Sequence, residues 1–336
     1  MKRGLIVICG PTAAGKTALS LTLAEKLRSP ILGADSRQIY REMDIGTAKP
    51  TTEERSRVPH YLVDCWDPRE NLTLAVYQTE AQTLIQKFHH PVDRTAADTA
   101  TDTATDETIA VPLLVGGTGL YIKSIARGMK IPQVPPQTDL RNKLKTISQR
   151  ERYQWLGQVD PTAAEKIHAN DETRTLRALE VFYATGKPLS SLQGEDPPPY
   201  PILTIGVDCL NDPVGSKGAE HPDDRLTQRI KKRTTAMINQ GLVEEVQDLR
   251  DRYGPDLPLL QTLGYAEIGQ YLDGKCTLAE AEAQTARHTR QFAKRQRTWF
   301  RRDRTIHWID SDDPHQWDTV WEWVQTFLQR IPKDLP

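Results

Sequence analysis

Short apolar runs alternate with helix-like segments along most of this chain. Five runs have the length and the continuous apolar character of buried strands, at residues 5–9, 30–34, 60–63, 111–115 and 202–207. Segments with helical spacing of apolar residues follow, as at Leu19, Leu23 and Leu27. Buried strands that alternate with helices are typical of a parallel sheet flanked by helices. We therefore predict an α/β fold.

Residues 129–200 interrupt this alternation. Prolines at 132–136 break the chain, helical patterns follow at 138–152, 161–167 and 171–185, and a proline-rich stretch ends the module at 195–201. We predict an α/β core formed by residues 1–128 and 201–336, with an inserted helical domain at 129–200. Residues 93–108, which repeat Thr-Ala-Thr-Asp, and the polar residues 211–224 are expected to be surface loops without catalytic duty.

The turn after the first predicted strand has the P-loop pattern of Gly, four residues, Gly, Lys and Thr, between a strand and a helix. Glycines let the backbone wrap tightly, and free amides at a helix start attract anions. We therefore predict a P-loop NTPase-like sheet and a phosphate site in which Lys16 reaches the outer phosphate and Thr17 holds a Mg²⁺ ion. The loop consists of Gly10, Pro11, Thr12, Ala13, Ala14, Gly15, Lys16 and Thr17.

Asp35 directly follows the second predicted strand. Ligands of α/β folds bind at the carboxyl ends of parallel strands, but an Asp after a strand also commonly caps the next helix. Both interpretations stay open from this stretch alone. The strand at 111–115 opens into a glycine-rich turn with Thr118, which permits either close ligand approach or tight packing. We find no apolar run that ends in an Asp of the type that holds Mg²⁺ in ATPases.

Arginines gather on two predicted helices. Arg225, Arg229 and Arg233 recur every four residues and share one face, which either clamps an anion opposite the P-loop or lies in solvent. Arg174 and Arg177 share a helix face within the inserted module, where solvated surface and phosphate contact are again both open.

A third helical stretch, at residues 283–302, contains no Asp or Glu. A solvated helix usually mixes charges of both signs, whereas a stripe of one sign with interleaved aromatic residues favours a polyanion whose bases stack. We therefore predict an RNA interface. Its cations recur at steps of 3, 4, 3 and 4, and they are Arg287, Arg290, Lys294, Arg297 and Arg301. The aromatic residues are Phe292, Trp299 and Phe300.

Composition adds little to this picture. The 336 residues carry a formal net charge of −1, and the four cysteines have no metal-ligand spacing. No run approaches the length of a membrane span, so we expect a cytoplasmic protein. We interpret Trp317, Trp321 and Trp323 as packing residues of a final helix.

Taken together, these motifs resemble those of the tRNA dimethylallyltransferase family, which prenylates the adenine beside the anticodon. The resemblance runs nearly end to end. It is carried by the P-loop, Asp-Ser-Arg-Gln-Ile-Tyr from Asp35, Asp-Ile-Gly-Thr-Ala-Lys-Pro from Asp44, Leu-Val-Gly-Gly-Thr-Gly-Leu-Tyr from Leu114, Arg-Ala-Leu-Glu-Val from Arg177, Gly-Tyr from Gly264, and Lys-Arg-Gln-Arg-Thr-Trp-Phe-Arg from Lys294.

The resemblance implies transfer of a dimethylallyl group from dimethylallyl diphosphate to N6 of the adenosine 3′ to the anticodon, by a monomer. It implies that the P-loop, Lys16 and Thr17 with Mg²⁺ hold the diphosphate, and that Arg233 holds it from the far side. Asp35 is implied as the base that accepts the N6 proton, and Thr118 as a substrate contact near the reacting centre.

The resemblance also implies contacts with tRNA for four segments, besides Thr118. They comprise Asp35, Ser36, Arg37 and Gln38; Thr173, Arg174, Thr175, Leu176 and Arg177; Gln261, Thr262, Leu263, Gly264, Tyr265 and Ala266; and Lys294, Arg295, Gln296, Arg297, Thr298, Trp299, Phe300 and Arg301. Two other hypotheses compete. A P-loop small-molecule kinase does not account for the basic stripe, and a non-catalytic RNA-binding switch does not account for Asp35 beside the phosphate site.

Overall fold

A computed structural model describes residues 3–90, 111–210 and 225–332. The two predicted loops, at 93–108 and at 211–224, lie outside the described residues. The chain forms two compact units. We call them the sheet unit, which comprises Met1–Leu72, Glu80–Ile122 and Pro199–Pro336, and the helical unit, which comprises Thr73–Thr79 and Lys123–Pro198. Within the described ranges, no helix has the length and apolar character needed to cross a membrane.

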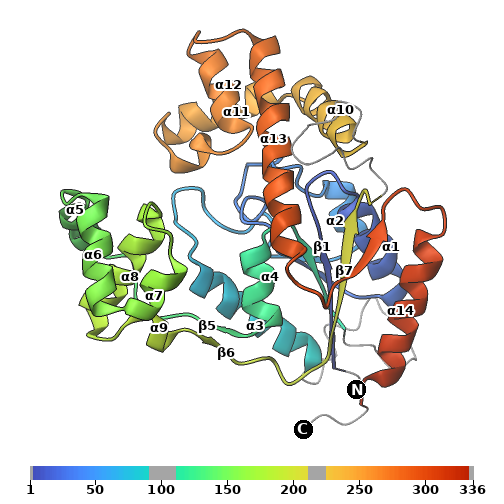
Figure 1. The fold of residues 1–336 in the computed structure, drawn as a ribbon. Helices are drawn as coiled ribbons and strands as arrows, with labels where there is room; N and C mark the ends of the chain where they lie inside the picture. Colours follow the sequence, from blue (N-terminus) through green and yellow to red (C-terminus); the bar gives the residue numbers. More distant parts are fainter. Residues whose placement is uncertain (1–2, 91–110, 211–224, 333–336) are drawn as a thin grey trace, which may run out of the picture. The chain divides into compact units, whose positions relative to one another are not determined.

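The sheet unit is built on a six-stranded sheet in which every neighbouring pair is parallel. Its strands, in spatial order, are β3 (His60–Tyr61), β2 (Ile31–Gly33), β4 (Leu113–Gly116), β1 (Leu5–Cys9), β7 (Ile202–Asp208) and β8 (His307–Asp310). All five residues of β1 are buried, because helices cover both faces of its sheet. The predicted α/β fold with a parallel sheet is therefore confirmed (Figure 1). Of these six strands, β8 alone was not predicted from the sequence.

The first and last helices share one hydrophobic core with the sheet. α1 (Lys16–Leu27) packs on β1 and β4, and α14 (Gln316–Arg330) packs on β7 and β8. Trp317, Trp321 and Trp323 lie partly buried against that core, as predicted. The other helices with residues in this unit are α2 (Thr52–Arg57), the later part of α3 (Leu74–His89), the start of α4 (Gly119–Ala126), α10 (Arg225–Asn239), α11 (Leu242–Tyr253), the 3₁₀ helix η1 (Pro258–Gln261), α12 (Tyr265–Leu272) and α13 (Leu278–Phe300).

The helical unit has its own hydrophobic core, with Leu156, Ala178 and Leu179 fully buried. Its elements are β5 (Met129–Lys130), α5 (Thr138–Lys145), α6 (Gln149–Val159), α7 (Pro161–Lys166), α8 (Glu172–Thr185), α9 (Leu189–Leu192) and β6 (Gly194–Glu195), besides parts of α3 and α4. The pattern at 138–152 predicts one helix, but two helices occupy it. Ser148 and Glu151 form a capping box that starts α6, so the first helix ends before them.

A buried carboxylate holds α8 to the start of α5. Glu180 is fully buried, and its oxygens accept hydrogen bonds from the Gln137 backbone N–H at 2.7 Å and from Arg141 Nε at 2.7 Å. Arg177 Nη1 donates to the same carboxylate at 2.5 Å. Burial alone would raise the pKa of Glu180, but these donors hold it at about 2. The carboxylate is therefore ionised at neutral pH.

We expect Glu180→Ala to lower the free energy of unfolding by about 3 kcal/mol at pH 7, because it leaves two arginines without their buried partner. The folded pKa lies below the ordinary value of 4.5. The advantage of the wild-type chain is therefore complete above that pH and is lost as the pH falls toward 2.

Urea unfolding at pH 7 and pH 3 measures this difference. Glu165 is exposed on α7, and Glu165→Ala is a matched control expected to change the unfolding free energy by less than about 0.5 kcal/mol. Equal unfolding midpoints for the two variants at pH 7 would contradict the role given to Glu180.

Candidate active site

A cavity of about 830 Å³ lies in the sheet unit, where the loops that follow β1, β2 and β4 meet. Carboxyl ends of parallel strands share one edge of a sheet, so residues far apart in the sequence come together there. Lys16, Asp35, Gln38, Arg233 and Gln296 all line this cavity. The cavity thus joins the P-loop to the predicted base and to two residues of the predicted basic helix, Phe292 and Gln296.

The P-loop lies tightly against the neighbouring strand β7. Gly10 has φ of +143°, and a Cβ at this position would lie 2.1 Å from the carbonyl oxygen of Val207, so only glycine fits. The loop leads into α1 at Lys16, whose Nζ donates to the Pro11 carbonyl oxygen at 2.7 Å. Burial lowers the pKa of Lys16 to about 8, against the opposing effect of Asp35. The ammonium group is thus charged at neutral pH.

Of the three arginines on the α10 face, one reaches the P-loop. Arg233 Nη1 donates to Thr12 Oγ1 at 3.2 Å, and burial lowers the pKa of its guanidinium while Asp35 opposes that shift. Arg225 and Arg229 instead form ion pairs with Asp312. The two alternatives left open for this face therefore divide among its residues: Arg229 borders the cavity but is ion-paired with Asp312, and Arg233 is the guanidinium beside the phosphate loop.

Asp35 caps a turn and also borders the cavity. Its Oδ1 accepts hydrogen bonds from the backbone N–H groups of Arg37, at 2.9 Å, and Gln38, at 3.4 Å. A turn follows rather than the helix that the capping interpretation assumed. Among the described residues no donor is bonded to Oδ2, so this oxygen can accept a proton from a bound ligand.

Thr118 lies against the turn that holds Asp35. Its hydroxyl oxygen accepts from the Ser36 backbone N–H at 3.0 Å, and its own backbone N–H donates to the Ala34 carbonyl oxygen at 3.0 Å. The glycine-rich turn after β4 therefore packs tightly on the turn after β2. Gln38, in the same turn as Asp35, donates from Nε2 to the carbonyl oxygens of Thr47 and Ala48, at 3.1 and 2.9 Å.

Two neighbouring residues of α13 turn inward from the predicted basic stripe. Gln296 is buried, and Arg297 binds Asp208 through Nε and Nη2 at 2.7–3.0 Å. Arg297 therefore leaves the solvent-facing stripe. Asp208 is the last residue of β7, so an apolar strand does end in an Asp that the sequence analysis did not single out. Both oxygens of this carboxylate accept hydrogen bonds from the Arg297 guanidinium group, so the carboxylate is not open toward a metal ion.

The remaining residues predicted to contact tRNA differ in exposure. Within 294–301, the side chains of Lys294, Arg295, Thr298, Trp299 and Arg301 are exposed, whereas Phe300 is buried. Within 261–266, Gln261 is exposed and Tyr265 is buried. In the helical unit, Thr173 and Arg174 are exposed, Thr175 is buried, and Arg177 is bonded to Glu180. In each segment, therefore, only the exposed residues can contact RNA at the surface, and the buried residues face the protein interior.

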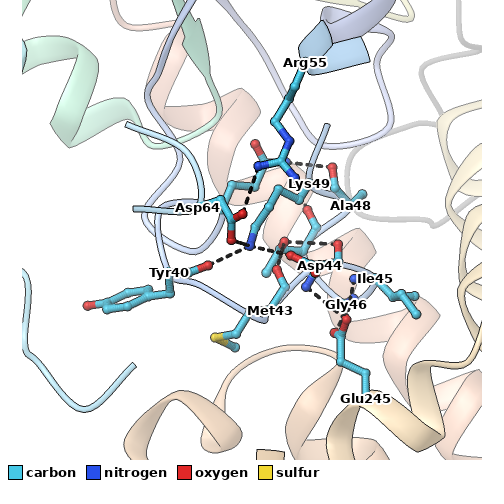
Figure 2. A network of polar contacts seen from close by, with 12 residues as sticks. Tyr40, Met43, Asp44, Ile45, Gly46, Ala48, Lys49, Arg55, Asp64 and Glu245 are labelled. Atoms are coloured by element: carbon cyan, nitrogen blue, oxygen red, sulfur yellow. Dashed lines mark hydrogen bonds and ion pairs between the residues drawn. The ribbon is translucent and has the colours of Figure 1, made fainter. Parts of the chain in front are cut away.

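A network that the sequence analysis missed holds one wall of the cavity (Figure 2). The side chain of Lys49 is 1% exposed, and its ammonium group donates to the Tyr40 carbonyl oxygen and to Asp64, both at 2.8 Å. Burial alone would raise the pKa of Asp64, but hydrogen bonds from Lys49 and Arg55 hold it below its ordinary value. The lysine thereby fixes the loop whose Thr47 and Ala48 border the cavity.

Glu245 of α11 holds the beginning of the same loop. Its carboxylate accepts from three consecutive backbone N–H groups, those of Asp44, Ile45 and Gly46, at 2.7–3.0 Å, and from the Tyr265 hydroxyl at 2.7 Å. The resemblance around Asp44 marked this loop as specific, but no sequence pattern indicated its partners on α11 and α12.

Comparisons with known proteins agree with this geometry. The sequence model described as IPP transferase matches residues 38–303, and the one described as isopentenyl transferase matches residues 3–65. Proteins named tRNA dimethylallyltransferase from Gloeothece citriformis and Acaryochloris marina are 52% and 54% identical over 97% of this chain, and over 97% and 98% of their own lengths.

Solved structures are similar as well. The full-length tRNA isopentenylpyrophosphate transferase from Bacillus halodurans is 34% identical with a TM-score of 0.66, and the match covers 98% of this chain and 97% of that one. A eukaryotic dimethylallyltransferase described as acting on tRNA is 25% identical with a TM-score of 0.78, over 99% of this chain and 81% of that one. From the extent of the family match and of these similarities, we conclude that the chain belongs to the IPP transferase family.

Proposed function

We propose that this enzyme transfers a dimethylallyl group from dimethylallyl diphosphate to N6 of the adenosine 3′ to the anticodon in tRNA, and releases diphosphate. The observation that carries the proposal is one cavity that joins a P-loop with two half-buried cations, Lys16 and Arg233, to the carboxylate of Asp35. Such a cavity offers an anion site for a leaving group beside a base for a nucleophile. Family membership and the names of the relatives support prenyl transfer onto tRNA.

On the donor side, the leaving group gains negative charge as the allylic carbon–oxygen bond breaks. Lys16 and Arg233 would hold the diphosphate from two sides, with the P-loop amides beneath it. Positive charge that is already in place lowers the barrier, because no solvent has to reorganise during the reaction. Both cations lie on the cavity wall, so a bound diphosphate would contact them directly.

On the acceptor side, the N6 amine of adenine is a poor nucleophile. Its nitrogen would form the new bond to the allylic carbon while the bond to the diphosphate oxygen breaks, and Oδ2 of Asp35 would take the N6 proton. The adenine base must leave its stack to reach a cavity, and bases in RNA loops are readily unstacked. The exposed residues Lys294, Arg301 and Arg174 are our candidates for contacts with the RNA backbone.

Mg²⁺ is the proposed metal ion. The described residues contain no cluster of His, Cys, Asp or Glu side chains that would bind a metal ion by itself. The exposed hydroxyl of Thr17 at the start of α1 fits the usual pattern, in which Mg²⁺ binds one or two protein oxygens and the phosphates of a substrate. When bound, the ion would neutralise charge on the departing diphosphate. We further propose that the enzyme acts as a monomer in the cytoplasm.

Incubation with Mg²⁺, dimethylallyl diphosphate and unmodified tRNA, without ATP, tests the proposal. We expect the tRNA to gain the mass of one five-carbon prenyl group per molecule, measured by mass spectrometry of the RNA. A second reaction contains ATP in place of the prenyl donor and serves as the control. A gain of phosphate mass with ATP, or no gain with the prenyl donor, would favour a kinase instead.

The base role of Asp35 is separable from its turn-capping role. Asp35→Asn retains an oxygen that accepts the N–H groups of Arg37 and Gln38, but it cannot take up a proton. We expect this variant to keep the wild-type melting temperature and to lose turnover by about 10²–10⁴-fold, measured as single-turnover prenyl transfer. Wild-type turnover in this variant would leave Asp35 with the capping role only.

The pKa of Lys16, about 8, predicts how diphosphate binding responds to pH. Between pH 7 and pH 9 the protonated fraction falls about tenfold, so the affinity for Mg²⁺-diphosphate should fall by a similar factor. In Lys16→Arg the charge persists throughout this range.

Calorimetric titration of both proteins measures the effect. The ratio of the wild-type to the Lys16→Arg dissociation constant should rise about tenfold from pH 7 to pH 9, because titration of the ligand itself affects both proteins equally. A ratio that does not vary with pH would show that the charge of Lys16 is not used in binding.

A further inference from the structure

Gln296 bonds to two loops that border the cavity, the P-loop and the glycine-rich turn after β4. Its Oε1 accepts from the Thr12 backbone N–H at 2.8 Å, and its Nε2 donates to the Gly117 carbonyl oxygen at 2.9 Å. A backbone N–H only donates and a carbonyl only accepts, so both contacts together require a carboxamide of this orientation. A Cβ on residue 117 would lie 2.3 Å from Nε2, so glycine is needed for this approach.

Each of the two loops carries part of the proposed chemistry. Thr12 belongs to the P-loop, and its hydroxyl accepts the hydrogen bond from Arg233. Gly117 directly precedes Thr118, which accepts the Ser36 backbone N–H in the turn of Asp35. One buried side chain therefore spans from the diphosphate side of the cavity to the side of the base.

The helix that carries Gln296 is itself anchored at the same sheet edge. The next residue, Arg297, binds Asp208 at the end of β7. Lys294, on the same helix, and Arg301, the residue that caps its C-terminus, are exposed. Residues 296 and 297 thus connect one helix to the loops or ends of three adjacent strands, β4, β1 and β7.

We propose that Gln296 is a positioning residue for prenyl transfer. It fixes the separation between the P-loop and the turn of Asp35, and with it the distance between the donor carbon and the acceptor amine. This inference rests on the proposed function. Reaction rates depend steeply on such distances, and a displacement of about 1 Å costs about 10²-fold. Gln296 would therefore act on turnover more than on the binding of either substrate, whereas the resemblance implied that Gln296 itself contacts tRNA.

The test compares Gln296→Met, which has a similar length but makes neither hydrogen bond, with Gln291→Met at an exposed position of the same helix. We expect Gln296→Met to lower kcat by about 10²-fold, with KM for tRNA and the dissociation constant for Mg²⁺-diphosphate within about threefold of wild type. Gln291→Met should retain the wild-type kcat.

Gln296→Glu provides a second variant, because it keeps an acceptor for Thr12 but has no donor for Gly117. We expect a loss of kcat like that of Gln296→Met. Three results would overturn the proposal: wild-type kcat in either Gln296 variant, a loss of kcat matched by an equal loss of diphosphate affinity, or failure of both variants to fold.

An assay of prenyl transfer by the wild-type enzyme distinguishes these outcomes from a failure of the proposed function. If it transfers no prenyl group, the proposed reaction itself is refuted. The effect of the variants on Mg²⁺-diphosphate binding, measured without RNA, still shows whether Gln296 affects the donor side alone.

Discussion

Positive charge that the protein does not fully neutralise lies at the P-loop, and the chemistry of the site depends on it. Burial lowers the pKa of both Lys16 and Arg233, and Asp35 opposes this shift in each case. Arg297, at the same edge of the sheet, instead has its own acid in Asp208. Buried charge is costly unless it is paired. A bound polyanion such as diphosphate would supply the missing negative charge, so a preference for an anionic ligand follows from the fold itself.

The parallel sheet makes this arrangement possible. Because β1, β2, β4 and β7 all point the same way, the loops that follow them meet at one edge, where each supplies a different group. The loop after β1 supplies amides and Lys16, and the turn after β2 supplies Asp35. The loops themselves are irregular, so their order comes from side chains that reach in from elsewhere. Lys49 and Glu245 hold one wall of the cavity in this way.

The residues that the sequence predicted best are those whose role depends on local pattern. A strand, a glycine-rich turn and a helix specify the P-loop within a few residues, so Lys16 and Thr17 could be identified without tertiary information. Contacts between residues far apart in the sequence have no comparable local pattern from which they could be predicted. Helical spacing placed Arg297 on a basic stripe, but a buried carboxylate 89 residues away in sequence turns it inward. The burial of Lys49 and the contacts of Gln296 likewise depend on which segments the fold brings together.

The pairing of Asp208 with Arg297 distinguishes this site from that of a P-loop phosphotransferase. In P-loop nucleotidases an Asp at the end of a neighbouring strand holds Mg²⁺. Here the carboxylate in that kind of position accepts a guanidinium group from α13, and the adjacent Gln296 binds the P-loop. The helix whose exposed cations we propose as RNA contacts is therefore bonded directly to the P-loop. In such an arrangement the P-loop is fixed relative to a bound acceptor, which suits a reaction in which the whole diphosphate departs and the carbon group moves to RNA.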